Sequence, residues 1–376
     1  PDLALIASRD GPAAAAAVFT RNRFAAAPII VAREHLAASG GRVRGVVANA
    51  GCANAGTGED GIRAARRMAE AAAGHLGCEV EEVLPASTGL IGSRLAVEAI
   101  EATLPAIRLR SGRAAGTAVA RAIMTTDTRP KQAAVRTELV PGQTVVVGGV
   151  AKGAGMIHPS MGTMLAFVTT DAAASPRLLD ALLRPAVETT FNQVSVDGDE
   201  STNDLVLLLA GGLADNAPIE DPGDPRADAL GAAVHAVCRR LARQIAADGE
   251  GARRRIDVSV RGAMNDVEAR RLARAVAASN LVKAAVHGGD PNWGRILAVI
   301  GQHAAALEPA RVCVSIGEEL VFAGVPVAFS ARAAARAMSR AAVRLSIDLQ
   351  AGVGTGEAWG CDLTAEYVAI NSEYTT

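Results

Sequence analysis

Short apolar runs alternate with helix-like segments over the first third of the chain. APIIVA (27–32) and RGVVANA (44–50) are rich in β-branched residues and predict strands. Between residues 61 and 77 the apolar positions recur at helical spacing and stop at Gly77, which predicts a helix that ends there. This alternation is typical of an α/β fold.

Two further apolar runs flank a glycine-rich segment in the middle of the chain. TVVVGGVAKGAG (144–155) and TMLAFVTTD (163–171) predict strands, and the glycine-rich segment between them predicts a loop. Thr163 therefore falls at the start of a strand that is expected to be buried.

The second half mixes both kinds of element. A polar, proline-rich stretch (214–228) is expected to be a surface loop or a lobe boundary, and it precedes an amphipathic helix at 229–249. Helices are also predicted at 267–279 and 330–345, and a pair of strands at 311–329. No internal repeat is visible.

Composition narrows the classes of function. With 376 residues, 50% of them hydrophobic, the chain can bury a substantial core in one large or two medium domains. Lysine and arginine total 38 against 39 acidic residues, and aromatic residues make up only 3%. Neither nucleic acid nor an anionic membrane is therefore favoured as a partner.

The five cysteines are widely spaced and include no C-x-x-C pair, so neither a disulfide framework nor a zinc site is indicated. No run reaches the ~18 apolar residues of a membrane helix, and the start lacks the order of a signal peptide. We expect a soluble, cytoplasmic protein. Because the first residue is Pro1 and not Met, further N-terminal residues are also expected.

The segment GMIHPSMGTMLAF (155–167) allows two readings of Thr163. It is either an ordinary strand residue or a nucleophile made by cutting the chain before it, since the freed α-amino group would serve as a base for its own hydroxyl. The hydroxyl would attack the Gly162 carbonyl and form an ester that water hydrolyses, and a glycine permits that close approach. Spacing alone favours the ordinary strand residue.

Five other segments carry candidate chemistry. PASTGLIG (85–92) is a turn that could aim hydroxyl and backbone donors at an oxyanion, and IMTTDTRPK (123–131) gathers hydroxyls before a strand. Lys152 could bind a carboxylate and Glu250 an amino group, whereas HGGDPNWGR (287–295) is dense in functional groups. Taken singly, each has a plain structural explanation, such as a turn, a strand end, a solvated lysine or a glutamate that faces water.

Taken in order, these motifs resemble those of the ornithine acetyltransferase family, the glutamate N-acetyltransferases of arginine biosynthesis. Several long motifs in one order are far more specific than any single one, and they run from near residue 18 to the last residue. The matching stretches are VFTRNRF, NAGCANAGTG, ASTGLIG, IMTTDTRPK, AKGAGMIHPSMGTMLAFVTTD, SVDGDESTNDLVLL, ADGEGA, VHGGDPNWGRI and GCDLTAEYVAINSEYTT.

The resemblance implies a precursor that cuts itself between Gly162 and Thr163. The products would be an α chain (1–162) and a β chain (163–376) that stay together and pair as an (αβ)2 heterotetramer. The implied fold is a mixed α/β, ornithine acetyltransferase/aminopeptidase-like architecture of packed sheets and helices shared by both chains, with a smaller second lobe in the β chain.

The resemblance also assigns roles to single residues. Thr163 would be the nucleophile, and Thr88 and Gly89 would form the oxyanion hole. Thr128 is expected to contact the substrate, with Thr126 as the alternative in the same cluster. The other implied substrate-binding residues are Lys152, Thr163, Glu250, Asn371 and Thr376.

These roles fit the transfer of an acetyl group from N2-acetylornithine to glutamate in a ping-pong reaction that requires no metal and no cofactor. Lys152 would bind the α-carboxylate, and Glu250 or the carboxylate of Thr376 would bind the side-chain ammonium. Whether acetyl-CoA is a second acetyl donor is left open by these residues. A paralogue in a specialised pathway and a self-processing aminopeptidase of the same fold are the alternatives, and an uncut metabolite-binding homologue is a third.

Three positions depart from the family pattern. Glycine stands at 162 where alanine is usual, Ser160 replaces an asparagine, and Gly289 replaces an alanine. The first two are expected to change the rate of self-cleavage and not its position. The segment ahead of VFTRNRF is short.

Overall fold

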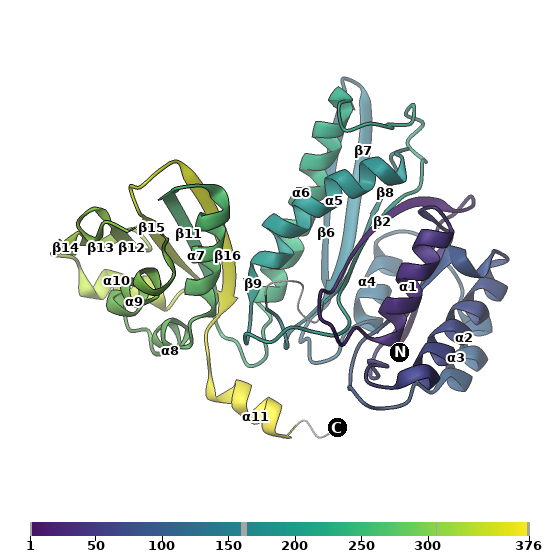
Figure 1. Ribbon diagram of the computed structural model, residues 1–376, viewed down its shortest axis with the longest axis horizontal. Coiled ribbons are helices and arrows are strands. Elements are labelled where there is room, and N and C mark those ends of the chain that lie inside the picture. The colour runs from purple at the N-terminus through teal and green to yellow at the C-terminus, as the bar shows by residue number, and fades with distance from the viewer. Residues whose placement is uncertain (1, 159–163, 306, 374–376) are drawn as a thin grey trace.

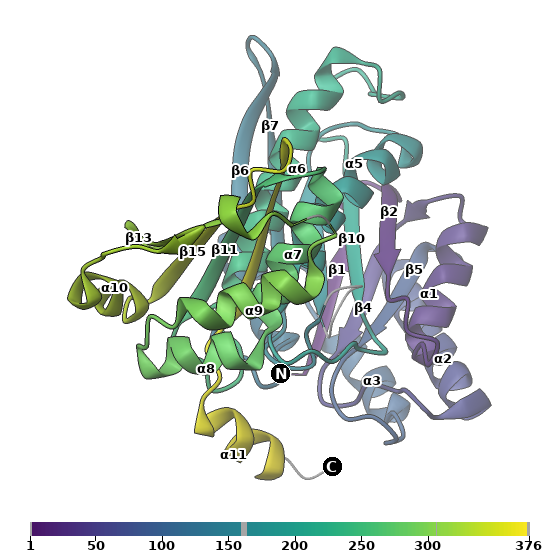
Figure 2. The ribbon, with the colours of Figure 1, turned by 60° about the vertical axis from the view of Figure 1, so that its left-hand side comes forward.

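The computed structural model describes residues 2–158, 164–305 and 307–373. Its strands form three sheets, with helices packed on their outer faces (Figures 1 and 2). The three-stranded sheet has the order β1-β4-β5, the six-stranded sheet β3-β2-β10-β8-β7-β6, and the seven-stranded sheet β14-β13-β12-β15-β11-β16-β9. The mixed α/β class predicted from the sequence is confirmed.

The elements have the following bounds. The strands are β1 (Leu3–Ala7), β2 (Ala13–Phe19), β3 (Arg42–Val43), β4 (Gly45–Asn49), β5 (Val83–Ser87), β6 (Lys131–Val140), β7 (Gln143–Lys152), β8 (Leu165–Thr170), β9 (Val194–Ser195), β10 (Leu205–Ala210), β11 (Arg255–Ala263), β12 (Cys313–Ile316), β13 (Glu319–Ala323), β14 (Val325–Pro326), β15 (Ala342–Asp348) and β16 (Gly354–Cys361). The α-helices are α1 (Ala27–Ala38), α2 (Gly58–Leu76), α3 (Val97–Thr103), α4 (Arg113–Ala122), α5 (Pro176–Thr189), α6 (Pro225–Ala246), α7 (Asp266–Ala278), α8 (Asn280–Gly288), α9 (Trp293–His303), α10 (Ala331–Met338) and α11 (Ala365–Glu373).

The six-stranded sheet is buried on both faces. Alternate residues of a strand face opposite sides of a sheet, so in β2 Ala14 and Ala16 pack with α5 and α6, while Ala13, Ala15 and Ala17 face the three-stranded sheet. The outer face of that smaller sheet is covered by α2 and α3, where Met68 and Ile100 are buried. The layers are therefore helix, sheet, sheet and helix.

The seven-stranded sheet has its own core. Alternate residues of β11, β12, β15 and β16 pack against α7, α8 and α9 on one side. The short strand β9 joins this sheet by pairing in parallel with β16. A segment that follows α5 thereby ties the seven-stranded sheet to the layers that hold the six-stranded one.

Most of the predicted elements are confirmed. The helix expected at 61–77 is α2, which ends at Gly77 in the left-handed conformation with φ +64°, and RGVVANA contains β4. The central apolar runs form β7 and β8, and the helix expected at 229–249 is α6, which begins at Pro225. The first turn of α6 therefore lies within the stretch that was expected to be a loop.

Two predictions were wrong. APIIVA is not a strand but the first half of α1, because the apolar residues continue into the helix-forming AREHLAA and bury one face. The helix predicted at 330–345 stops at Met338, and residues 342–348 form β15. Alternate buried residues there pair with β11 and β12, so sheet packing overrides the alanine-rich local preference.

Within the described ranges, no helix is long and apolar enough to cross a membrane.

Candidate active site

The turn at Thr88 and Gly89 directly follows β5. Gly89 has φ +131°, and a Cβ at this position would lie 2.3 Å from the backbone carbon of Gly51, so only glycine fits. The Thr88 N–H donates to the Asn49 carbonyl at 3.0 Å. Among the described residues the Gly89 N–H has no acceptor, so the turn presents a free backbone donor beside a threonine hydroxyl.

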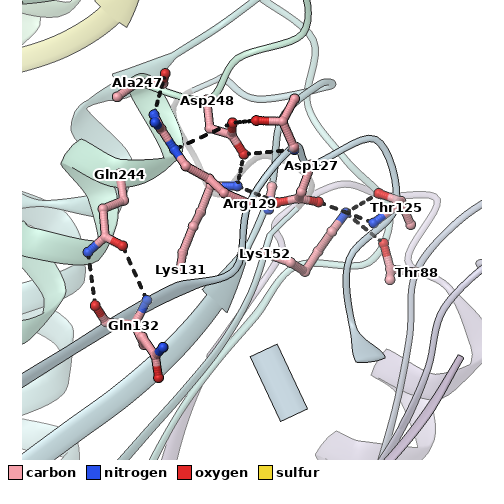
Figure 3. Close-up of polar contacts among 12 residues, drawn as sticks. Thr88, Thr125, Asp127, Arg129, Lys131, Gln132, Lys152, Gln244, Ala247 and Asp248 are labelled. Atoms are coloured by element: carbon pink, nitrogen blue, oxygen red, sulfur yellow. Dashed lines mark hydrogen bonds and ion pairs between the residues drawn. The ribbon is translucent and has the colours of Figure 1, made fainter. Parts of the chain in front are cut away.

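Lys152 is the last residue of β7, and its side chain is buried, with 2% exposed. Figure 3 shows its ammonium directed at two threonines. The Nζ atom donates to Thr125 Oγ1 at 2.8 Å and to Thr88 Oγ1 at 3.1 Å. Burial lowers the pKa of Lys152, and the charge of Asp127 opposes that effect. The reading of this residue as a solvated loop lysine was wrong.

Asp127 lies between Lys152 and a second buried lysine, Lys131. Its carboxylate accepts hydrogen bonds from the Gly153 N–H at 2.7 Å, from the Thr125 N–H at 3.2 Å and from the Lys131 ammonium. Burial by itself would raise the pKa of Asp127, but Lys152, Lys131 and the Gly153 N–H together lower it below its ordinary value. Asp127 is therefore an anion under Lys152.

Lys131 connects Asp127 to a second carboxylate, that of Asp248. The side chains of all three residues are nearly inaccessible to solvent, and the ammonium donates to both carboxylates. Asp248 also accepts from the backbone N–H of Thr128 at 3.1 Å and from its hydroxyl. The loop before β6 and the loop after α6 are thus held together by a buried ion cluster (Figure 3).

Glu250 lies two residues beyond Asp248 and does not face bulk water, since only 9% of it is exposed. Its carboxylate accepts a hydrogen bond from Asn371 Nδ2 at 2.8 Å, and its backbone N–H donates to the Ala154 carbonyl at 2.9 Å. A Cβ at Gly155 would lie 2.4 Å from the carboxyl atoms. The glutamate side chain therefore rests directly on the Gly155 backbone.

The start of β8 is fixed beside these residues. The backbone N–H of Met164, the first described residue after position 158, donates to Asp204 Oδ1 at 2.9 Å. In the sheet, Leu165 pairs directly with Lys152. Complete burial raises the pKa of Asp204 well above its ordinary value, which favours a neutral carboxyl group.

Asn203 links the start of β8 to the turn at Thr88 and Gly89. It precedes Asp204, and its Nδ2 donates to the carbonyl of Ser87, the residue before Thr88, at 2.9 Å. The segments that lie far apart in the sequence, near residues 88, 125, 152, 164, 204 and 250, thus converge on one buried polar site.

Comparison with known proteins identifies the family of this chain. The whole chain, residues 1–376, matches the ArgJ family. This chain belongs to the ArgJ family. The membership confirms the resemblance drawn from the motifs.

The arginine biosynthesis bifunctional protein ArgJ of Symbiobacterium thermophilum is 50% identical over 376 residues, which are 100% of this chain and 92% of the relative. The protein of the same name from Thermus thermophilus is also 50% identical, over 100% of this chain and 94% of the relative. The crystal structure of ArgJ from Bacillus halodurans matches with 42% identity and a TM-score of 0.54, over 55% of this chain and 98% of the solved chain.

Only some of the residues with expected roles lie in the part of the chain that the structure describes. Gly162, Thr163 and Thr376 lie outside the described residues. Thr88, Gly89 and Lys152 lie together, and Glu250 lies with Asn371. Their roles stay predictions. Within the threonine cluster, Thr125 contacts Lys152, whereas the hydroxyl of Thr128 is bonded to Asp248.

Sequence reasoning missed four residues of this buried polar site. Lys131, Asp248 and Asp204 stood inside quoted motifs without a role, and Thr125 was passed over for its neighbours. The available signal was a lone lysine and isolated aspartates in apolar surroundings, because such charges are rarely buried unless they are paired.

The HGGDPNWGR motif spans the end of α8 and the start of α9 and is not one long loop. His287 lies in the last turn of α8, with Nδ1 3.3 Å from the Asp362 carboxylate. Trp293 begins α9 and packs on Phe322 with ring centroids 5.4 Å apart. Arg295 donates to the Leu281 carbonyl. These contacts stabilise the second core.

Proposed function

We propose that this chain is an acyltransferase of arginine biosynthesis that moves an acetyl group from N2-acetyl-L-ornithine to L-glutamate. The products are L-ornithine and N-acetyl-L-glutamate. Relatives at 50% identity are named arginine biosynthesis bifunctional protein ArgJ. One observation carries the proposal. The turn at Thr88 and Gly89 and the side chain of Lys152 lie beside the start of β8, and β8 begins just after Thr163 in the sequence.

Self-cleavage between Gly162 and Thr163 would give the chains 1–162 and 163–376. Thr163 then has a free α-amino group that takes the proton from its own hydroxyl as the hydroxyl oxygen attacks the acetyl carbon. The resulting oxyanion is stabilised by the Thr88 hydroxyl and the Gly89 N–H. When the carbon–nitrogen bond breaks, ornithine leaves with the proton on its amino group.

The acetyl ester on Thr163 completes the reaction with glutamate. The glutamate amine attacks the ester carbonyl, and the same two donors hold the second oxyanion. The ester carbon–oxygen bond then breaks, and the proton lost by the amine passes through the Thr163 α-amino group to the threonine oxygen, which restores the hydroxyl. Glu250, oriented by Asn371, would bind the side-chain ammonium of ornithine as a charge-assisted pair. Thr128 and Thr376 complete the proposed binding residues, and acetyl-CoA is a second proposed donor.

The length of one solved relative supports the proposed cut. The solved ArgJ chain from Bacillus halodurans is matched over 98% of its length by 55% of this chain, so it is little more than half as long. A chain that begins at residue 163 would have about that share. We place two such αβ units in a heterotetramer, in the cytoplasm, where the free cysteines of the described residues would stay reduced.

Intact mass spectrometry tests the cut. Wild-type protein is expected to give two fragments that meet between Gly162 and Thr163, and Thr163→Ala is expected to give one uncut chain without transferase activity. Thr169→Ala, an exposed position of β8, is the matched control and should be cut normally. A wild-type chain that stays uncut would contradict the mechanism.

Donor and acceptor assays separate the alternatives. Transfer from N2-acetylornithine to glutamate is expected to exceed hydrolysis of the same donor. An aminopeptidase would instead release N-terminal amino acids from peptides and transfer nothing to glutamate. Transfer from acetyl-CoA, measured in parallel, decides whether the second donor is used.

A further inference from the structure

Lys152 is oriented towards the oxyanion turn itself. Two of its three N–H donors are bonded to threonine hydroxyls, those of Thr88 and Thr125, and its side chain is buried. A lysine that only bound a substrate carboxylate would be expected to present its ammonium to open space. Its actual contacts place it behind the oxyanion hole.

The direction of the hydrogen bond to Thr88 has a chemical consequence. A lysine ammonium donates and cannot accept, so Thr88 Oγ1 is the acceptor and the hydroxyl proton must point elsewhere. That proton is the one an oxyanion needs. A hydroxyl that accepts a charge-assisted hydrogen bond is also polarised, which makes it a stronger donor.

The surrounding charges keep this lysine in place. Asp127 lies beneath Lys152 and is fixed by the N–H groups of Gly153 and Thr125. Lys131 neutralises the excess negative charge of Asp127 and Asp248, so the cluster buries no uncompensated anion. The electrostatic neighbours of Lys152 are Asp127, Lys131, Asp204 and Glu250.

We propose that Lys152 is a positioning residue of the oxyanion hole, which acts through Thr88 by directing and polarising its hydroxyl, and that Asp127 and Lys131 hold it there. This role rests on the acyl transfer proposed above. It is separate from the binding of a substrate carboxylate, which is the other role expected of the same residue. The two roles predict different results for a donor that carries no carboxylate.

Acetylation by p-nitrophenyl acetate provides that donor. The rate of p-nitrophenol release and the acetyl group on the 163–376 fragment are measured for the wild type, Lys152→Met, Thr88→Ala and the double variant. Removal of an oxyanion donor at Thr88 is expected to slow acetylation by about 10²–10³-fold. Lys152→Met should slow it at least tenfold in wild-type background and less than threefold when Thr88 is already alanine.

The controls address folding. Lys283→Met removes a lysine that is just as buried but bonds the Val196 carbonyl, and it should leave acetylation within twofold of wild type. If Lys152→Met remains uncut, it has no free Thr163 to acetylate. Asp127→Asn then tests the proposal, because it leaves the lysine in place. Burial already lowers the pKa of Lys152 and Asp127 raises it, so the alkaline limb of the acetylation rate should move to lower pH in that variant.

The outcomes are distinct. If the wild type is not acetylated on Thr163, the proposed function fails together with this inference. If the wild type is acetylated while Lys152→Met reacts equally fast with p-nitrophenyl acetate and shows only a raised KM for N2-acetylornithine, Lys152 binds carboxylate and this inference alone is wrong. An unmoved pH profile in Asp127→Asn would overturn it as well.

Discussion

The glycine at position 155 lets the Glu250 carboxylate lie directly against the backbone. Gly155 lies against the Glu250 carboxylate, and no φ in the left-handed region restricts that position to glycine. A methyl group there would still meet the carboxyl atoms at 2.4 Å, well inside the contact distance of about 3.5–4.0 Å. The side chain of Glu250 would have to move.

Gly155→Ala is therefore expected to weaken binding of the donor. Loss of one charge-assisted hydrogen bond is worth about 1.5–3 kcal/mol, so KM for N2-acetylornithine should rise roughly tenfold or more. The control is Gly148→Ala in β7, where an added Cβ meets nothing closer than 4.0 Å. Steady-state kinetics of the two variants provides the comparison, and equal KM values would mean that Glu250 does not bind the donor.

At the residue scale, the sequence predicted which side chains are candidates for the chemistry better than it predicted whether they are buried. Lys152 and Glu250 were selected as candidates, yet both were also read as groups that face water, and both are buried. Asn371 bonds Glu250 from a distant part of the chain, and the charge of Asp127 acts on Lys152. Such pairings follow from the fold and not from local spacing.

At the scale of elements, prediction succeeded where local preference and packing agree. α2 has helical spacing and a glycine at its end, and β7 and β8 are buried β-branched runs. APIIVA and residues 342–345 were assigned to the wrong class, because their partners in the core and in the sheet determine their conformation. A short apolar run does not distinguish a strand from a helix.

Helix α11 is an element held mainly by polar contacts. None of its residues is buried, and its attachments include the bond from Asn371 to Glu250 and the bond from the Thr364 hydroxyl, just before it, to the Gly251 carbonyl. Elements with few buried apolar contacts open with a small free energy. The helix is thus expected to be among the least protected parts of the site.

Hydrogen exchange measures this protection. Amides of α11 should exchange much faster than those of α6, which contributes many buried residues to the core. Thr364→Ala should speed exchange in α11 further and leave exchange in α6 unchanged. A bound acetyl donor that contacts Glu250 should instead slow exchange in α11. Equal protection of the two helices in the free protein would contradict this picture.

At the scale of the whole molecule, the proposed cut falls within a shared core. Strands β2, β3, β6 and β7 precede it and β8 and β10 follow it, yet all six form one sheet. β10 lies between β2 and β8, and Lys131 pairs with Asp248 across the same division. The core on both faces of the six-stranded sheet is therefore built by both proposed chains.

In the cut protein, the layers around the six-stranded sheet are expected to unfold as a unit. Both fragments should elute together in size-exclusion chromatography, and thermal unfolding should show one transition for the layers around the six-stranded sheet, at a temperature independent of the probe that follows it. Thr163→Ala, which keeps the chain intact, is the reference. Fragments that separate under native conditions would show that the shared sheet does not hold them.

The anchoring of Met164 also bears on the lifetime of the proposed β chain. Chain ends usually fray and are the first places where exopeptidases start. Here the second residue of the new chain donates to a buried carboxyl group and the third is already paired in a central sheet. An exopeptidase needs several extended residues in its own cleft, so it would have to unravel the sheet before removing one amino acid. The reactive end would thus also be protected against trimming.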